Sequence, residues 1–331
     1  MSAVLLAGSS CLTASGGGVT GWLLVANKGA RNLSVVDPVE GKQVSVIAED
    51  GVTGHEVIAS PDGQLAYVPI FGNSGVGRPG TDGQLIRVMD LVQRKIVSTV
   101  DFGRGVRPHC PVIHPKTGEL YVTTEIENSV SIIDPKTLKI IGAIPTGRPE
   151  SHMLALSHDG KRGYTANVAS GTISVLDLEK RALVTTIPAA ARVQRVTVSP
   201  DDRWVVTADQ TKLRLVVIDA RTNEVSTSIP LPGLGYGTAF TRDGNWLLVA
   251  LPSLKQVGFI DWKTKQVVAT VDVPKAPQAV LLQPGDAFAY VSCDASAQVA
   301  VIDVAQRTVA KLIAVGPGAD GLAWAPAVKR P

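Results

Sequence analysis

Residues 132–144 read IIDPKTLKIIGAI, in which an apolar pair leads into Asp134, a polar turn follows, and a second apolar run ends the stretch. A polar turn between two β-branched runs is typical of a β-hairpin. The pattern occurs seven times, and its aspartates are 53, 44, 43, 42, 42 and 42 residues apart: Asp37, Asp90, Asp134, Asp177, Asp219, Asp261 and Asp303. Because aspartate accepts backbone N–H groups in turns, we interpret all seven as turn formers and not as catalytic acids.

A tight-turn sequence, of which Ser60-Pro61-Asp62-Gly63 is one example, precedes the hairpin in six of the units. Pro, Asp and Gly are the residues that such turns require, and a β-rich run lies on each side. One unit therefore holds four strands in about 42 residues. Seven such units, which bury their faces by stacking on one another, predict an all-β, seven-bladed β-propeller with four-stranded antiparallel blades.

The two ends of the repeat region supply complementary halves of one blade. Residues 22–27 match the second strand of the later units, and residues 320–326 match an inner strand. We therefore expect the ring to close by pairing N-terminal and C-terminal strands, which removes exposed sheet edges. This divides the chain into a leader (residues 1–20), one propeller domain (residues 21–327) and a tail (residues 328–331).

Composition and charge exclude several classes of function. The 32 basic and 29 acidic residues are interspersed without a basic run, so no nucleic-acid partner is predicted. No apolar stretch reaches the ~18 residues that a membrane span needs. The three cysteines are too few and too scattered for a disulfide framework or a zinc knuckle.

The start of the chain, MSAVLLAGSSCL, is apolar and is followed by Ala14-Ser15-Gly16, as at the end of a secretory signal. It lacks the positively charged leader of such a signal. We expect a truncated export signal and a periplasmic or extracellular protein. A disordered leader on a cytoplasmic protein is the alternative.

Four of the units carry a tyrosine before the hairpin, in Tyr67-Val68, Tyr121-Val122-Thr123-Thr124, Tyr164-Thr165-Ala166-Asn167 and Tyr290-Val291-Ser292. With the hairpin that follows, these segments resemble the YVTN-type (YncE-like) propeller repeat over about residues 22–326. The resemblance implies the propeller fold, with relatives among bacterial surface and periplasmic proteins. More distant propellers with similar repeats include lactonases, streptogramin lyases and d1-haem proteins, so the fold alone selects no activity.

The positions at which the units differ point to a site. Five residues before each tight turn, where the innermost strand begins, each unit carries a polar or hydrogen-bonding residue: His55, His109, His152, Gln194, Tyr236, Gln278 and Asp320. Strand preferences would allow Val or Ile there. We predict that these side chains line the mouth of the central channel, with three histidines in consecutive blades.

Three imidazoles from neighbouring strands are a candidate ligand set for one divalent transition metal ion, Zn, Cu, Fe or Ni, with an open position for water or substrate. The alternative is a hydrated channel lined by neutral histidines, one of which could act as a general base. On either hypothesis the candidate catalytic residues are His55, His109, His152 and Glu150.

Further polar groups are expected at the same mouth. Glu125 is one because it follows a second strand, and Arg107 is another because it precedes an inner strand. The predicted ligand-binding set is Gln194, Tyr236, Gln278, Asp320, Arg107, Glu125 and Arg78, and Arg195 is a candidate anion contact. By strand alternation, Glu56 and Cys110 should face the neighbouring blade and not the channel. His114 and His158 lie at tight turns at the opposite end, where we expect ordinary surface residues.

The 53-residue spacing between Asp37 and Asp90 reveals an insertion at residues 71–83, FGNSGVGRPGTDG. It joins the second and third strands of a blade, which places it on the histidine face. Its five glycines predict a mobile loop, and long loops of this kind often act as lids or binding loops.

Two function classes fit these features. The first is a small-molecule site at the channel mouth, where a metal centre of three histidines supports hydrolytic, lyase or oxidative chemistry on a small polar substrate. The second is a non-enzymatic binding or scaffold propeller of the cell envelope that presents loops to a protein partner. The sequence leaves open whether the protein is an enzyme, and metal content would discriminate the two classes.

Overall fold

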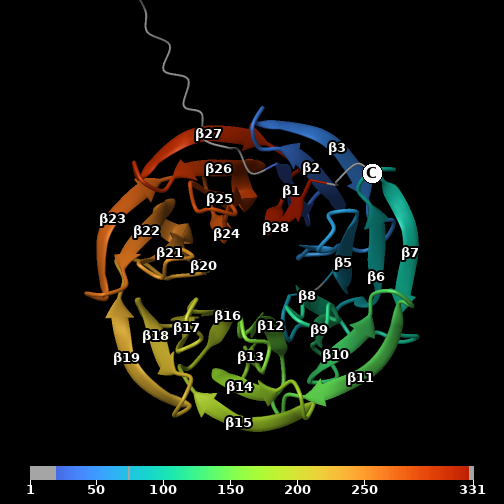
Figure 1. The fold of residues 1–331 in the computed structure, drawn as a ribbon, viewed down its shortest axis with the longest axis horizontal. Helices are drawn as coiled ribbons and strands as arrows, with labels where there is room; N and C mark the ends of the chain where they lie inside the picture. The colour runs from blue at the N-terminus through green and yellow to red at the C-terminus, as the bar shows by residue number, and fades with distance from the viewer. Residues whose placement is uncertain (1–19, 74, 328–331) are drawn as a thin grey trace, which may run out of the picture.

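The computed structural model describes residues 20–73 and 75–327. Its strands form seven four-stranded antiparallel sheets, which are arranged as blades around one axis (Figure 1). The predicted all-β, seven-bladed propeller is confirmed. Among the described residues, no helix has the length and apolar character that a membrane crossing needs.

Each blade extends from an innermost strand beside the axis to an outermost strand at the rim. Blade 1 contains, in that order, β28 (Ala319–Pro326), β1 (Gly21–Asn27), β2 (Asn32–Asp37) and β3 (Lys42–Ala48). Blade 2 contains β4 (Ile58–Ala59), β5 (Leu65–Gly72), β6 (Asp82–Asp90) and β7 (Lys95–Asp101). Blade 3 contains β8 (Pro108–Ile113), β9 (Leu120–Thr124), β10 (Ser129–Asp134) and β11 (Lys139–Pro145). Blade 4 contains β12 (Ser151–Leu156), β13 (Arg162–Asn167), β14 (Thr172–Asp177) and β15 (Ala182–Pro188).

The remaining three blades follow the same plan. Blade 5 contains β16 (Val193–Val198), β17 (Trp204–Asp209), β18 (Arg214–Asp219) and β19 (Glu224–Pro230). Blade 6 contains β20 (Thr238–Phe240), β21 (Trp246–Leu251), β22 (Gln256–Asp261) and β23 (Gln266–Asp272), with the short 3₁₀ helix η1 (Pro252–Leu254). Blade 7 contains β24 (Pro277–Leu282), β25 (Phe288–Cys293), β26 (Gln298–Asp303) and β27 (Thr308–Ala314), with η2 (Asp294–Ser296).

The seven repeated aspartates end the third strand of each blade and form the expected turns. Each accepts a backbone N–H two or three residues further on, as Asp134 does from Lys136 at 2.9 Å. The residue four positions after each aspartate has a positive φ, and it is a glycine only at Gly41. A positive φ costs conformational energy at any residue but glycine, and the hydrogen bonds of the aspartates stabilise the turns that contain it. The interpretation of these aspartates as structural is confirmed.

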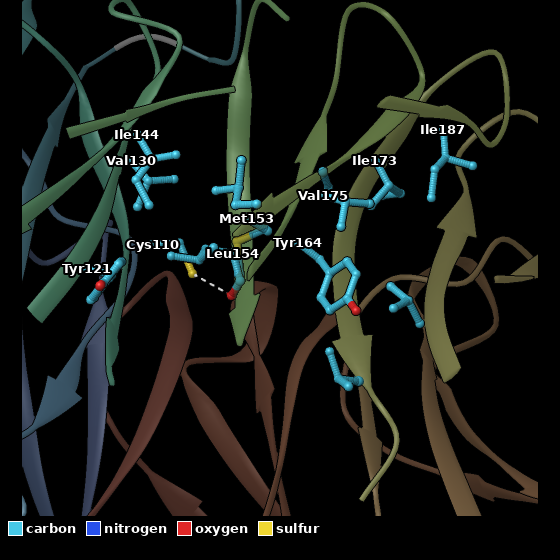
Figure 2. Close-up of a cluster of buried hydrophobic side chains, with 14 of the residues drawn as sticks. Cys110, Tyr121, Val130, Ile144, Met153, Leu154, Tyr164, Ile173, Val175 and Ile187 are labelled. Carbon is cyan, nitrogen blue, oxygen red and sulfur yellow. Dashed lines mark hydrogen bonds between the residues drawn. The ribbon is translucent and has the colours of Figure 1, made fainter. Parts of the chain in front are cut away.

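Apolar side chains pack between adjacent blades and form the core. The repeated tyrosines, at 1 or 2 % exposure, are among the largest buried side chains: Tyr67, Tyr121, Tyr164 and Tyr290. Figure 2 shows part of the cluster that joins blades 3, 4 and 5, with Cys110 beside Leu154 of the next blade. The Sγ atom of Cys110 lies 3.5 Å from the carbonyl oxygen of Leu154, so this thiol faces the neighbouring blade as expected.

The chain ends meet in blade 1, where the ring closes. Strand β1 pairs antiparallel with β28 over most of its length, from Gly21 opposite Pro326 to Asn27 opposite Ala319 (Figure 1). The expected closure by N-terminal and C-terminal strands is confirmed. Apart from Thr20, the expected leader and the tail lie outside the described residues, and so does the apolar start on which the export hypothesis rests.

We predict that a chain ending at Gly318 loses cooperative unfolding. Without β28, one edge of β1 is unpaired, and the apolar faces of Leu23 and Leu24, which are fully buried, lose their cover. Calorimetry or thermal circular dichroism measures this, with a chain ending at Ala327 as the control. A sharp transition at the wild-type temperature in the shorter chain would show that the ring does not depend on β28.

Candidate functional site

A β-bulge marks the start of the innermost strand at the channel mouth. In β8, Pro108 pairs with Thr124 and Pro111 with Val122, so two residues of β8 lie opposite one of β9. The inner strands β12, β16 and β24 carry an equivalent irregularity between Ser151 and Met153, Val193 and Val196, and Pro277 and Val280. A bulge bends its strand and changes the direction of its side chains, so simple alternation does not apply at the mouth.

The structure brings the three predicted histidines together. The rings of His109 and His152 are stacked, with centroids 3.7 Å apart and an interplanar angle of 29°. The ring of His55 stands edge-on to His109, at 5.6 Å. His109 and His152 are buried, whereas His55 is half-buried and forms the solvent side of the cluster.

Phe71 is the shared neighbour of all three imidazoles, and no sequence pattern singles it out. Its ring centroid lies 5.0 Å from His55, 5.2 Å from His109 and 5.8 Å from His152. It is fully buried near the end of β5, and the guanidinium of Arg107 lies 5.7 Å from its centroid. The insertion therefore begins after this residue, and Phe71 belongs to the site and not to a mobile loop.

Burial favours the uncharged form of all three imidazoles. Burial lowers the pKa of His55 to about 4, although the charge of Asp320 acts in the opposite direction. Burial also lowers the pKa of His109 well below its ordinary value, and the neighbouring His152 and His55 add to the effect. The pKa of His152 is lowered by burial and partly restored by Glu125. A neutral imidazole has one nitrogen lone pair available to a proton, a hydrogen-bond donor or a metal ion.

Glu125 and Arg107 connect this cluster to the loop above it. Nη1 of Arg107 donates to Glu125 at 3.1 Å, its Nε donates to Asp82 at 2.6 Å, and its Nη2 donates to the carbonyl oxygen of Arg78 at 2.6 Å. Glu125 also accepts the backbone N–H of Gly77 at 3.1 Å. Two residues of the loop are thus held at the channel mouth by buried groups of blade 3.

Glu150 lies against the same loop. Its carboxylate fills the space where a side chain at Gly77 would stand, and Gly77 has a φ of 66°, so this position requires glycine. Burial raises the pKa of Glu150, and the nearby charge of Glu125 adds to the rise. Arg78 contributes its backbone carbonyl group, while its side chain is exposed.

Arg195 crosses the channel, contrary to strand alternation. From blade 5, its Nη1 donates to Glu56 of blade 2 at 2.6 Å and its Nη2 to Asp320 of blade 1 at 3.2 Å. Neither blade adjoins blade 5, so Glu56 faces the axis, and the expectation that it faces a neighbouring blade was wrong. The bulge is the reason in β16, because it turns both Gln194 and Arg195 toward the channel.

The charges of this cross-channel network are paired within the protein. Burial opposes the charge of Arg195, but Glu56, Tyr236 and Asp320 outweigh it and raise the arginine pKa. Burial likewise acts to raise the pKa of Asp320, but Lys28 and Arg195 hold it below its ordinary value. Lys28, which sequence reasoning missed, bonds to Asp320 at 3.3 Å and to Asp294 at 2.7 Å.

The rest of the mouth is polar and half-buried. Nε2 of Gln194 donates to the hydroxyl oxygen of Tyr236 at 2.8 Å, and the guanidinium of Arg195 lies 5.0 Å from the ring centroid of Tyr236. Gln278 is half-buried at the equivalent position of blade 7. These residues and His55 form the part of the mouth that solvent reaches.

The two remaining histidines lie at tight turns as expected, but only His158 is exposed. His114 is buried, and the surface role expected for it was wrong. Its Nδ1 accepts the backbone N–H groups of Lys116 and Thr117, and its Nε2 donates to the carbonyl oxygen of Gly160 in the next blade at 2.8 Å. His114 therefore joins blades 3 and 4 as a structural residue.

Glu49 is a third group, after Phe71 and Lys28, that the sequence did not reveal. It is fully buried after β3, its Oε2 accepts the N–H of Gly54 at 2.8 Å, and its Oε1 has no partner. Burial raises the pKa of Glu49 to about 7, and the bond from Gly54 offsets only a part of this. Gly54 precedes His55 and forms a β-bridge with Ile70, the residue before Phe71. By bonding to Gly54, Glu49 therefore helps to position the backbone next to both His55 and Phe71.

Among the described residues, no group of three or more His, Cys, Asp or Glu side chains stands in an arrangement that would hold a metal ion. The shared ion expected from the sequence stays a prediction.

Comparisons with known proteins relate the chain to one family and to several propellers. The family described as a domain of unknown function (DUF5074) matches residues 116–314. No curated protein matches the chain significantly. Similar solved structures include hydrazine synthase of Kuenenia stuttgartiensis, at 18% identity and a TM-score of 0.75, covering 86% of this chain and 93% of the other.

Two further structures have the same fold. One is the dihydro-heme d1 dehydrogenase NirN in complex with DHE, at 13% identity and a TM-score of 0.67, covering 91% of this chain and 74% of the other. The second is a functionally unknown protein from Desulfotomaculum acetoxidans, at 13% identity and a TM-score of 0.76, covering 92% and 99%. At these identities the likeness shows the propeller fold alone.

We predict that Glu49→Gln stabilises the protein above neutral pH. The folded state holds the Glu49 proton up to a pKa of about 7, above the ordinary 4.5, so the contribution of this group to stability is greatest below pH 4.5 and is lost as the pH rises through 7. At full ionisation the loss is up to about 3 kcal/mol, and glutamine does not suffer it.

Chemical denaturation between pH 5 and pH 8.5 measures this difference, with Glu40→Gln at an exposed position as the matched control. The gap between Glu49→Gln and wild type should widen as the pH rises. A gap that stays constant over this range would mean that Glu49 does not titrate in the folded protein.

Proposed function

The chain belongs to the family described as a domain of unknown function (DUF5074), and we propose that its propeller binds a small polar molecule at the mouth of the central channel. The observation that carries this proposal is unused hydrogen-bonding capacity inside the site. Nδ1 of His109 is buried without a hydrogen-bond partner, and Nδ1 of His152 and Oε2 of Glu125 lie 3.4 Å apart without the alignment of a hydrogen bond. Each such atom costs about 1–3 kcal/mol, which a ligand recovers when it bonds to them.

The surrounding charges favour an uncharged polar ligand. The half-buried rim consists of the amide, phenol and imidazole groups of Gln194, Gln278, Tyr236 and His55. Below them, the charge of Arg195 is already matched by Glu56 and Asp320. A charged ligand would have to displace one of these buried partners, and breaking a buried pair costs about 3–5 kcal/mol.

Acid–base chemistry at this site would depend on His152. Its Nδ1 lies 3.4 Å from Oε2 of Glu125, although the direction does not suit a hydrogen bond. Catalytic hydrogen bonds are often long without substrate, and a small rotation of the ring would align this one. Glu125 would then hold the Nδ1–H form of His152 and leave Nε2 as the base. Glu150, with its raised pKa, is the accompanying acid.

A transition metal ion bound by His55, His109 and His152 is a second candidate, and their neutral state favours it. Such an ion would polarise a carbonyl group or lower the pKa of a bound water towards ~7. The rings of His109 and His152 are stacked and lie in nearly parallel planes, so they must move apart before lone pairs of both converge on one ion.

The alternative of a scaffold propeller in the cell envelope needs no ligand at the mouth, so binding at this site separates the two hypotheses. A periplasmic or extracellular location stays a prediction, because it rests on residues outside the described part of the chain.

We predict that a panel of small polar compounds contains ligands that raise the melting temperature of the wild-type protein. A ligand at 100 times its Kd adds about 2.7 kcal/mol to the free energy of unfolding. Tyr236→Phe should weaken such a ligand about fivefold to tenfold, since it removes one hydrogen bond at the rim. His55→Gln should also weaken it, because the amide does not place its polar atoms where the imidazole nitrogens lie. Differential scanning fluorimetry followed by calorimetric titration measures both effects.

The matched control is Tyr164→Phe, which removes a phenol hydroxyl between blades and away from the mouth. Zn²⁺, Cu²⁺, Fe²⁺ and Ni²⁺ belong in the panel, and stabilisation by one equivalent of an ion, lost in His55→Gln, would support the metal centre. Ligands that bind both rim variants as tightly as wild type would place the binding site elsewhere.

A further inference from the structure

Residues at the opposite end of the inner strands line a cavity of about 540 Å³. The order of residues along β16 shows that it is distinct from the imidazole mouth. Gln194 lies at the imidazole mouth, Arg195 crosses the channel, and Thr197 and Val198 line the far cavity. The ion pairs of Arg195 with Glu56 and Asp320 therefore lie between the imidazole mouth and the far cavity.

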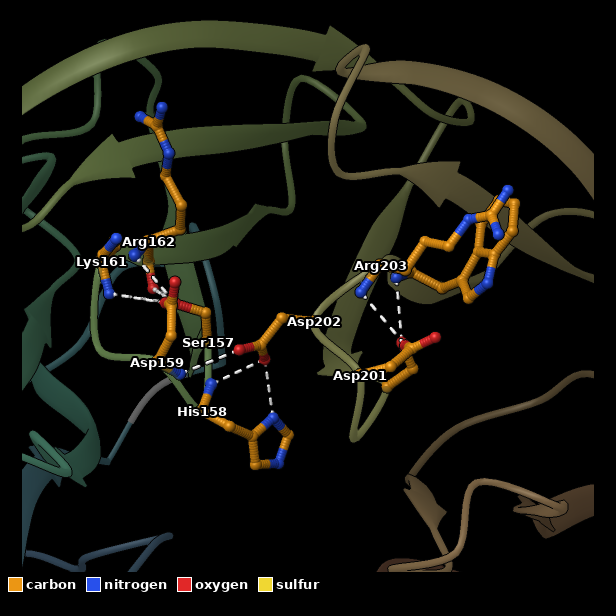
Figure 3. Close-up of polar contacts among 10 residues, drawn as sticks. Ser157, His158, Asp159, Lys161, Arg162, Asp201, Asp202 and Arg203 are labelled. Carbon is orange, nitrogen blue, oxygen red and sulfur yellow. Dashed lines mark hydrogen bonds and ion pairs between the residues drawn. The ribbon is translucent and has the colours of Figure 1, made fainter.

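One wall of this cavity carries a histidine in a fixed orientation. Nδ1 of His158 lies 2.7 Å from Oδ1 of Asp202, which belongs to the tight turn of the next blade (Figure 3). The same carboxylate accepts the backbone N–H groups of His158 at 2.6 Å and Asp159 at 2.8 Å. Since a carboxylate accepts, Nδ1 of His158 is the donor, and Nε2 is left to accept a hydrogen bond.

A similar bond between tight turns joins blades 6 and 7, but without an imidazole. There the carboxylate of Asp286 accepts the backbone N–H of Arg242 at 2.5 Å. Both acids are thus engaged by donors of the neighbouring turn. Arg242 is an exposed residue at the edge of this cavity, and its guanidinium makes no ion pair with any residue in the described ranges.

Between these polar groups the wall also carries apolar side chains. Val198, Phe240 and Leu281 come from the inner strands of three consecutive blades and line the cavity. Phe240 and Leu281 are only partly buried, so an apolar ligand would shield surface that water now reaches. A guanidinium recognises a carboxylate with charge-assisted hydrogen bonds, and the imidazole acceptor suits a hydroxyl or N–H donor.

From this geometry we infer that the far mouth is a second binding site, for a small carboxylate with an apolar body and a hydroxyl or N–H donor. Arg242 binds the carboxylate, His158 accepts the hydrogen bond of the donor, and Phe240 and Leu281 contact the apolar body. Asp202 is a positioning residue that fixes the ring of His158. This site is independent of the imidazole mouth and of the function proposed for it.

The test uses 4-hydroxyphenylacetate as the probe and its amide, 4-hydroxyphenylacetamide, as a control of the same shape without the charge. The full-length protein carries ¹⁵N-labelled histidine, and the spectrum of His158→Gln assigns the His158 ring. The carboxylate should shift the His158 signals in a saturable manner while the signals of His55, His109 and His152 stay in place. The amide and the Arg242→Gln variant should each weaken binding about tenfold.

Arg221→Gln, at an exposed position paired with Asp219 within its own hairpin, is the matched control and should bind as wild type does. The inference is overturned if the carboxylate produces no saturable shift, if the amide binds equally well, or if Arg242→Gln has no effect. Shifts confined to His55, His109 and His152 would also overturn it, and would leave the function proposed for the imidazole mouth standing.

Discussion

The pairing of β1 with β28 is the constraint on which the other features depend. Seven blades stack without an edge only if the last inner strand joins the first blade, and this pairing fixes all seven inner strands around one axis. Equivalent positions of the blades then meet at one level of the channel. His109 and His152 are in contact because their blades occupy neighbouring places in a closed ring, although 43 residues separate them in the chain.

The closed ring also divides the channel by charge. Arg195 reaches two blades that do not adjoin its own, and Lys28 carries the network on to Asp294 of blade 7. These charged groups are paired with one another and lie next to the imidazole mouth. At the mouth itself, burial favours the neutral form of the histidines. The two ends of the channel therefore differ in chemistry: hydrogen-bonding groups line the imidazole mouth, and polar and apolar groups together line the far cavity.

The periodic parts of this architecture could be predicted from the sequence, because equivalent residues recur at a regular spacing along the chain. The aspartate turns, the four-strand units and the shared phase of His55, His109 and His152 all follow from a repeat near 42 residues. The failures lie where periodicity carries no information. A β-bulge changes side-chain direction, as it does for Arg195 in β16, and contacts across the channel, such as those of Glu56 and Lys28, leave no local pattern. Phe71 and Glu49 act through burial, which a single residue in a strand or loop does not reveal.

The protonation state of the imidazole cluster is the most direct test, since neutral rings with unpartnered nitrogens are what make the mouth a site for an uncharged polar ligand. Side-chain ¹H–¹⁵N spectra of the histidine-labelled protein between pH 3.5 and pH 8 measure it. We predict that His55, His109 and His152 are uncharged at pH 7 and that His55 gains its proton only near pH 4. Their depressed pKa values make protonation destabilising, so stability should decline as the pH falls below the ordinary histidine value of about 6.5. A charged ring at pH 7, or a titration of any of the three near 6.5, would contradict the assignment of a neutral imidazole cluster.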